Sequence, residues 1–261
     1  LTDRLPLIAD YYRASDADLI GMQEVNRTGT ALFETLGDVY APVALRHPED
    51  KHCFTPILYR ADKFELIDSA FGAYPEQMEG YEGIFNDAKS KSWNLGVFRI
   101  KESGKIFIFA TTHLWWKKSP VDETSFGNNS YQAGSDEARE YQIATLAEKI
   151  RFYREKYDCP AVLVGDLNTS YRSKAIKYLL DHGFRHAHNI ATEYVDESIG
   201  YHDCFGWGYT TEYYSGPFED AIDHILLIGE KDGAVKRFER YSPDYYFPIS
   251  DHSPAFIDVE F

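Results

Sequence analysis

Long hydrophobic runs, cysteine pairs and an excess of basic residues are all missing from this chain of 261 residues. No apolar run approaches the roughly 20 residues of a membrane span, and no basic start with an apolar centre marks a secretory signal. The three cysteines, Cys53, Cys159 and Cys204, are widely spaced and form no CxxC motif for zinc or redox chemistry. We therefore expect a cytoplasmic, reducing location and no transmembrane segment. Because the chain does not begin with Met, removal of a secretory signal stays open.

The charge balance is acidic, with 27 Lys and Arg against 42 Asp and Glu and a net charge of −15. Proteins that hold nucleic acid non-specifically usually present a basic face, because phosphate contacts supply most of that affinity. Part of the acidity can belong to a metal site, yet we expect long duplex DNA to be a poor substrate. No repeat, low-complexity segment or linker interrupts the chain. We expect one domain over residues 1–261, and a monomer.

Apolar periodicity predicts a mixture of helices and strands. The predicted helices cover residues 1–15, 135–157 and 173–182. The predicted strands cover residues 19–22, 55–59, 64–71, 94–100, 105–112, 161–164, 225–228, 235–241 and 255–260. Many strands with a few helices are typical of two packed sheets with helices outside, an α/β sandwich. Longer irregular stretches, which are often functional, cover residues 72–93, 115–134 and 192–220.

Five polar clusters stand directly beside the strand-like runs. They are Gln23-Glu24-Val25, Thr112-His113-Leu114, Gly165-Asp166-Leu167-Asn168-Thr169, Ile222-Asp223-His224 and Ser250-Asp251-His252-Ser253-Pro254. Acids, histidines and an amide delivered from several strand ends are what metal-assisted attack on a phosphate ester needs. The set therefore predicts an active site at one end of the strands.

The spacing within the clusters indicates how the side chains divide the work. Glu24 follows a buried strand, which places its carboxylate at the rim, and Mg²⁺ prefers such oxygen ligands. Asp166 and Asn168 are two apart, so both face one side if the segment is extended; a simple turn is an equally good interpretation of these residue types. Asp251 and His252 are adjacent and point in different directions if extended, which suits two separate tasks.

Taken in order, the segments GMQEV, TTHL, GDLNT, IDHIL and SDHSP resemble the endonuclease/exonuclease/phosphatase superfamily. The resemblance covers nearly the whole chain. It implies a DNase I-like four-layer α/β sandwich of two packed, mostly antiparallel sheets with outer helices. It also implies a Mg²⁺ or Mn²⁺ site that cleaves phosphate esters, with Glu24 and Asp251 as metal ligands. The catalytic residues that it implies are His113, Asp166, Asn168, Asp223 and His252.

The resemblance also implies roles for these residues. Asp166 would orient or deprotonate the attacking water, and Asn168 would donate to a phosphate oxygen. Asp223 would pair with His252, fixing its tautomer, while His113 would lie beside the phosphate. One departure is that the family opens with a strand carrying an Asn, and this chain begins in the following helix, so we expect an incomplete record.

Several other polar residues near the motifs receive a structural interpretation. We interpret His224 as structural, because it follows Asp223 and points the other way. We interpret Arg139 as part of a solvated helix face rather than a brace for the site, and Gln142 likewise. Lys89 and Lys91 are interpreted as solvated loop lysines rather than phosphate contacts.

Aromatic residues are expected to hold the specificity. Trp115 and Trp116 follow His113 with no spacer, so we expect at least one of them to contact substrate; loop packing is an equally good interpretation. We expect hydrolysis of a phosphodiester in a small or single-stranded substrate, as in a nuclease-like enzyme. The alternatives are a phosphomonoesterase for inositol or nucleotide phosphates, and a non-catalytic binding module of the same fold.

Overall fold

The computed structural model describes residues 4–26, 29–43, 54–122, 125, 127–194, 221–240, 250, 252 and 254–261. The helices are α1 (Leu5–Ser15), α2 (Ala31–Thr35), the 3-10 turn η1 (Asp87–Lys89), α3 (Ser135–Tyr157), α4 (Lys174–Asp181) and α5 (Ala187–Ile190). The strands are β1 (Leu19–Gly21), β2 (Ala41–Val43), β3 (Ile57–Tyr59), β4 (Phe64–Ala73), β5 (Ser92–Ile100), β6 (Ile106–His113), β7 (Ala161–Asp166), β8 (Arg185–His186), β9 (Glu193–Tyr194), β10 (Asp223–Ile228), β11 (Val235–Arg240) and β12 (Ala255–Val259). Among the described residues every predicted strand and helix is present, and the prediction missed short elements such as α2, β2, β8, α5 and β9.

A six-stranded sheet in the order β4-β5-β6-β7-β10-β8 forms the centre of the molecule. Its neighbouring strands are antiparallel except β6 and β7, which run parallel. The hairpin between β5 and β6 turns at Gly104, whose φ of 72° favours glycine. The central strands β6 and β7 are almost wholly buried, which explains why they read as continuous apolar runs.

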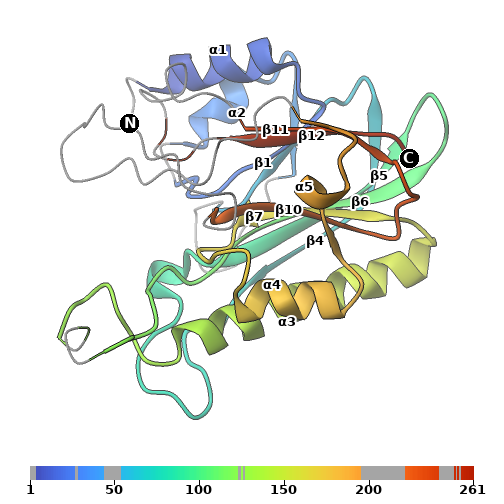
Figure 1. The fold of residues 1–261 in the computed structure, drawn as a ribbon. Helices are drawn as coiled ribbons and strands as arrows, with labels where there is room; N and C mark the ends of the chain where they lie inside the picture. The colour runs from blue at the N-terminus through green and yellow to red at the C-terminus, as the bar shows by residue number, and fades with distance from the viewer. Residues whose placement is uncertain are drawn as a thin grey trace.

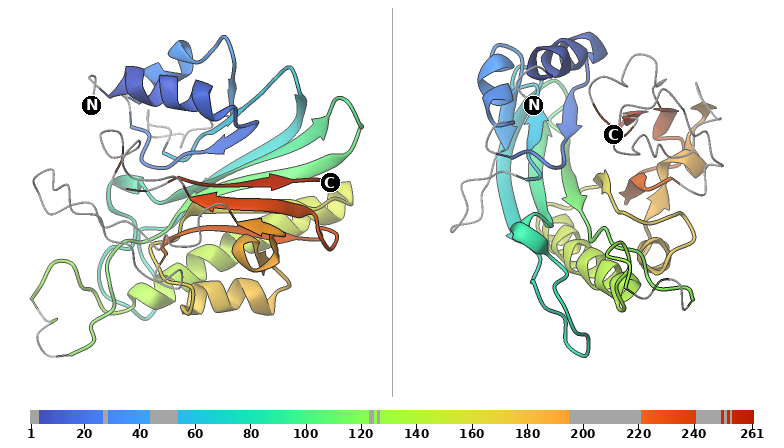
Figure 2. Two further views of the ribbon diagram at one scale, coloured as in Figure 1. Left: turned by 45° about the horizontal axis from the view of Figure 1, so that its top comes forward. Right: turned by 90° about the vertical axis from the view of Figure 1, so that its left-hand side faces the viewer.

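Helices and further strands cover both faces of this sheet (Figures 1 and 2). On one face lie α3 and α4. On the other face lie two three-stranded sheets, β1-β3-β2 and β12-β11-β9, with α1 and α2 packed outside the first of them. Alternate residues of β6 divide between the two faces: Phe107 and Phe109 enter one core, and Ile108 and Ala110 enter the other. The layers are therefore, in order, α1 with α2, the two three-stranded sheets, the six-stranded sheet, and α3 with α4.

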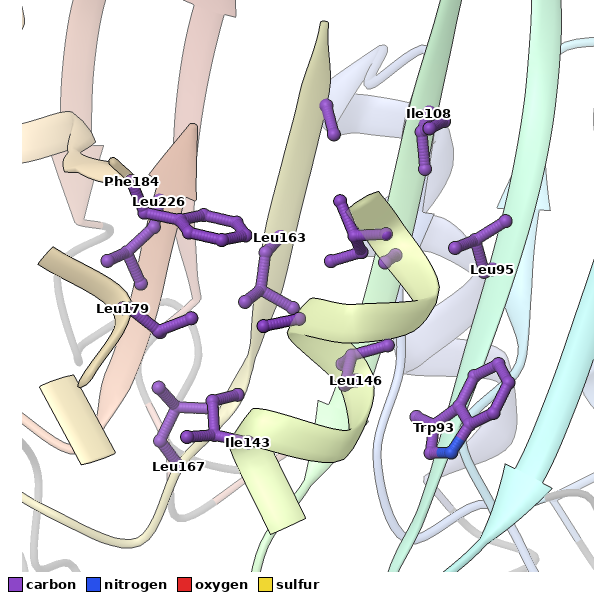
Figure 3. Packing of buried hydrophobic residues seen from close by; sticks show 14 of the residues in the cluster. Trp93, Leu95, Ile108, Ile143, Leu146, Leu163, Leu167, Leu179, Phe184 and Leu226 are labelled. Atoms are coloured by element: carbon purple, nitrogen blue, oxygen red, sulfur yellow. The ribbon is translucent and has the colours of Figure 1, made fainter. Parts of the chain in front are cut away.

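The core beneath α3 fixes the central strands against that helix (Figure 3). Ile143, Leu146 and Ile150 recur at helical spacing and are fully buried. They pack in one cluster with strand residues that include Leu95 and Leu163. Truncating such a buried side chain to Ala costs about 2–5 kcal/mol of stability, so this packing holds β5, β6 and β7 in a fixed position.

The edge strands of the two three-stranded sheets, β1 and β12, both line a cavity of about 1060 Å³. Within the described residues, β1 pairs only with β3 and β12 pairs only with β11, so each presents an edge to the cavity. Phe109 and Val164 of the six-stranded sheet are among the lining residues, and Asp223 and His252 also border the cavity. No helix in the described part of the chain has the length and apolar character that crossing a bilayer requires.

Candidate active site

Strand register brings three of the predicted site residues side by side. β6 and β7 are parallel and place His113 opposite Asp166. β10 is antiparallel to β7 and places Asp223 opposite Asp166 on its other side. The three side chains therefore come from the same end of three neighbouring central strands. Backbone hydrogen bonds, rather than loops, determine their spacing.

Asp166 and His113 form the buried floor of the site. The Nε2 atom of His113 lies 3.4 Å from Oδ2 of Asp166. Burial raises the pKa of Asp166 to about 7, and the nearby Asp223 carboxylate adds to this effect, while His252 opposes it. A carboxylate with such a pKa can accept a proton near neutral pH. Burial, with Lys91 and His252 nearby, holds the pKa of His113 well below its usual range.

Asp223 and His252 form the hydrogen-bonded pair expected from the sequence. The Nδ1 atom of His252 lies 2.7 Å from Oδ2 of Asp223. Burial raises the pKa of Asp223, but the His252 imidazole outweighs burial and the net pKa is lowered. Arg240, itself buried, donates to the Asp223 backbone carbonyl at 2.6 Å. The carboxylate thus fixes the orientation of the His252 ring.

Asn168 is held by a turn that ends β7. Its backbone N–H donates to Oδ1 of Asp166 at 2.8 Å, and its Nδ2 donates to the Leu114 carbonyl at 3.0 Å. Its φ is 50°, in the left-handed region that Asn tolerates. The turn that the residue types suggested is therefore present, and it brings the amide beside the ends of β6 and β7.

Glu24 reaches the same end of the sheet from beyond β1. Its φ of 58° is strained for a residue with a side chain. Its Oε1 atom lies 4.0 Å from Nε2 of His113, and its side chain is 79% exposed. The preceding Gln23 donates from Nε2 to Oγ1 of Thr111 on β6 at 2.9 Å, which ties this segment to the central sheet.

A model of the endonuclease/exonuclease/phosphatase family matches residues 4–252, which include every site residue described above. The chain belongs to this family. A search among proteins of curated function finds no match.

Solved structures similar to this family member support the fold. An endonuclease/exonuclease/phosphatase of Bacteroides vulgatus has a TM-score of 0.74 at 22% identity, covering 98% of this chain and 90% of that one. A mannosyl-6-phosphatase of Bacteroides thetaiotaomicron has a TM-score of 0.72 at 20% identity, covering 99% and 91%. Danio rerio TDP2, complexed with a single-strand DNA product, has a TM-score of 0.66 at 14% identity, covering 98% and 91%. The predicted DNase I-like α/β sandwich is therefore confirmed.

The donor chemistry of this endonuclease/exonuclease/phosphatase site fits a divalent cation. One ligand atom each from Asp166, Asp223 and His252 lies within 4.8 Å of the others. Two carboxylates on adjacent buried strands need positive charge nearby, and carboxylate oxygens suit Mg²⁺ or Mn²⁺. This group differs from the predicted ligand pair: Glu24, whose Oε1 lies 4.0 Å from Nε2 of His113, is not one of its three members, and Asp251 lies outside the described residues. The assignment of Glu24 and Asp251 as metal ligands stays a prediction.

Lys91 corrects the interpretation of the loop lysines as solvated. Its side chain is only 3% exposed, and its Nζ lies 2.7 Å from Nε2 of His113. No local pattern in the sequence indicates this contact, because Lys91 precedes β5 whereas His113 ends β6. Lys91 therefore joins the residues that the structure brings together in this family member.

Arg139 and Gln142 correct the prediction of a solvated helix face, because both are buried on α3. Gln142 accepts from the Trp115 N–H through Oε1 at 2.9 Å and donates through Nε2 to the Phe85 carbonyl at 3.0 Å. Arg139 donates through Nη1 to the carbonyls of Trp115 and Lys117, at 3.0 and 2.6 Å. One turn of α3 thus holds the loops before β5 and after β6.

The two tryptophans after His113 have different environments. Trp115 is 1% exposed and packs against Phe85 with ring centroids 6.0 Å apart, so it is a packing residue. Trp116 is 40% exposed, with its Nε1 donating to Asp87 at 3.3 Å. The ammonium of Lys117 lies 5.5 Å from the Trp116 ring centroid. Only Trp116 of the pair is thus available to a ligand.

His224 is buried on the strand that carries Asp223, as expected for a structural residue. Its Nε2 lies 2.7 Å from the Thr169 carbonyl, and its Nδ1 lies 3.0 Å from Nε2 of His186. A carbonyl only accepts, so Nε2 of His224 carries the proton. Burial lowers the pKa of His224 to about 4. The neutral imidazole therefore anchors the turn that contains Asn168.

Proposed function

We propose that this chain is a divalent-metal-dependent phosphoesterase that hydrolyses a phosphodiester in a small or single-stranded substrate. The observation that carries the proposal is the meeting of His113, Asp166, Asp223 and His252 at one end of the central sheet. Family membership supports hydrolysis of phosphate esters in general. The net charge of −15 favours a small substrate over long duplex DNA, because an acidic protein repels long polyanions.

In this reaction a water oxygen attacks phosphorus as the bond to the leaving oxygen breaks. Asp166 orients the water and accepts its proton, and the raised pKa of its buried carboxyl suits that task. His252, directed by Asp223, contacts a phosphoryl oxygen, and Asn168 donates to another. Glu24 and Asp251 would hold the cation, which supplies neutralisation of charge on the phosphoryl group when bound.

The test is a hydrolysis panel with Mg²⁺, Mn²⁺ and EDTA. It compares bis-p-nitrophenyl phosphate with p-nitrophenyl phosphate, inositol phosphates, mononucleotides, RNA, and single- and double-stranded DNA. We expect diester hydrolysis that EDTA abolishes and that His252→Gln reduces by at least 10²-fold, as removal of an acid–base group typically does. His182→Gln changes a surface histidine of α4's C-terminus and is the matched control, expected to retain wild-type rates.

Different results would point to the alternatives. Faster turnover of the monoesters would favour a phosphomonoesterase. Absence of turnover on every substrate with either metal would favour a non-catalytic binding module. Efficient, EDTA-sensitive nicking of plasmid DNA at low enzyme concentration would contradict the expected discrimination against duplex DNA.

A further inference from the structure

Hydrogen bonds from Asn86 and Tyr74 hold the backbone of Lys91 in place. The side chain of the fully buried Asn86 accepts from the Lys91 N–H at 2.7 Å and donates to the Lys91 carbonyl at 2.8 Å. The same carbonyl accepts from the Tyr74 N–H at 2.9 Å. These bonds fix the residue directly before β5, so its long side chain enters the site from a fixed backbone position.

The side chain ends at His113, on the floor of the site. Nζ of Lys91 lies 2.7 Å from Nε2 of His113. An ammonium has no lone pair, so the imidazole accepts this hydrogen bond and is neutral, with its proton on Nδ1. The lowered pKa of His113, caused by burial and by Lys91, has the same direction. The positive charge on this side of the site therefore belongs to Lys91 and not to His113.

The ammonium of Lys91 has hydrogen-bonding capacity left over. It carries three N–H donors, and His113 is its only hydrogen-bond partner among the residues that the structure describes. Burial lowers the pKa of Lys91, but the carboxylates of Asp166, Glu24 and Asp87 oppose this effect. A buried charge is costly unless it is paired, and the phosphate oxygens of a substrate would supply the missing acceptors.

We propose that Lys91 is a catalytic residue whose ammonium binds a non-bridging oxygen of the scissile phosphate, while His113 holds the ammonium in place. This inference rests on the proposed function. The ammonium offsets negative charge on the phosphoryl group as the water oxygen bonds to phosphorus and the leaving oxygen departs. Removing one preorganised donor of this kind typically lowers kcat by about 10²–10³-fold.

A structural lysine would behave differently on substitution, and this difference makes the proposal testable. A buried charge with too few partners carries a desolvation cost, and an apolar side chain of similar length removes that cost. We therefore expect Lys91→Met to lower kcat on bis-p-nitrophenyl phosphate by about 10²–10³-fold while its Tm stays unchanged or rises. Lys91→Arg keeps the positive charge, so its kcat should fall less than that of Lys91→Met. Lys101→Met removes an exposed lysine just beyond the other end of β5 and should behave as wild type.

Binding of inorganic phosphate, measured by calorimetry in EDTA, separates this proposal from the proposed function. We expect Lys91→Met to weaken phosphate binding at least tenfold and Lys101→Met to leave it unchanged. If wild type hydrolyses nothing, the proposed function fails, and the phosphate titration still decides the role of Lys91. A Lys91→Met variant that binds phosphate with wild-type affinity and keeps kcat within fivefold of wild type would overturn the proposal. Unfolding of both Lys91→Met and Lys91→Gln would also overturn it, because the lysine would then be a structural cation.

Discussion

Replacing Asp223 by Asn removes one negative charge and almost no volume from the hydrogen-bonded pair with His252. The 2.7 Å bond between Oδ2 and Nδ1 is charge-assisted, and such bonds contribute about 1.5–3 kcal/mol. Loss of that amount in the transition state corresponds to a decrease in kcat of about 10- to 150-fold. An Asn amide that turns its NH₂ towards Nδ1 also favours the wrong imidazole tautomer, so we expect the upper part of this range.

Stability must be measured beside activity, because Asp223 also faces the buried Arg240. The carboxylate raises the pKa of that guanidinium against the larger effect of burial, which lowers it. Asp223→Asn is therefore expected to lose about 1–3 kcal/mol in the free energy of unfolding, measured by urea denaturation. Asp232→Asn, the same substitution at an exposed surface ion pair, is the control and should change neither quantity. A folded Asp223→Asn variant with kcat within threefold of wild type would refute the reasoning.

Three further predictions follow from burial and close contacts. Trp115→Ala should lower the free energy of unfolding by about 3–5 kcal/mol, whereas Trp116→Ala should raise KM for the larger substrates and leave turnover of bis-p-nitrophenyl phosphate unchanged; equal kinetic effects of both on every substrate would contradict this division. Burial lowers the pKa of His224 from 6.5 to about 4, so below pH 6.5 the unfolded chain binds a proton that the folded state does not. The free energy of unfolding is therefore highest above pH 6.5 and falls by about 3 kcal/mol towards pH 4. In urea titrations at several pH values, His224→Gln should weaken this dependence on pH. Gly165→Ala would place a Cβ 2.1 Å from the Thr112 carbonyl oxygen, so soluble expression and activity should both be lost, and a variant with wild-type Tm would disprove the contact.

The central strands could be predicted from the sequence because both of their faces are buried. Runs such as Ile106 to Ala110 and Ala161 to Val164 are apolar throughout, and His113 and Asp166, shortly after these runs, mark the ends of the strands. The prediction of a shared site rested on these strand ends and on the family resemblance. The inference was most direct for Asp166, which lies opposite His113 on β6 and opposite Asp223 on β10.

Other features depended on contacts that leave no local pattern. The partners of Arg139 and Gln142 are backbone groups of distant loops. Every residue has such groups, so the residue types do not indicate which of them will lie beside the helix. Trp115 and Trp116 are identical in type, and only tertiary packing decides which of them turns inward. Lys91 looked solvated because a lysine is rarely buried without a partner, and its partner His113 lies 22 residues away. The single-domain prediction and the roles of the site residues stay predictions.

The hydrogen bonds from α3 to two separate loops have a consequence for how specificity can evolve. Gln142 joins the loop at Phe85 to the segment at Trp115, so these two walls beside the site cannot move independently. Substitutions in either wall should then be non-additive with substitutions in this turn of the helix. A variant selected for a new substrate would be expected to carry changes on α3 itself, in a helix that need never touch the substrate.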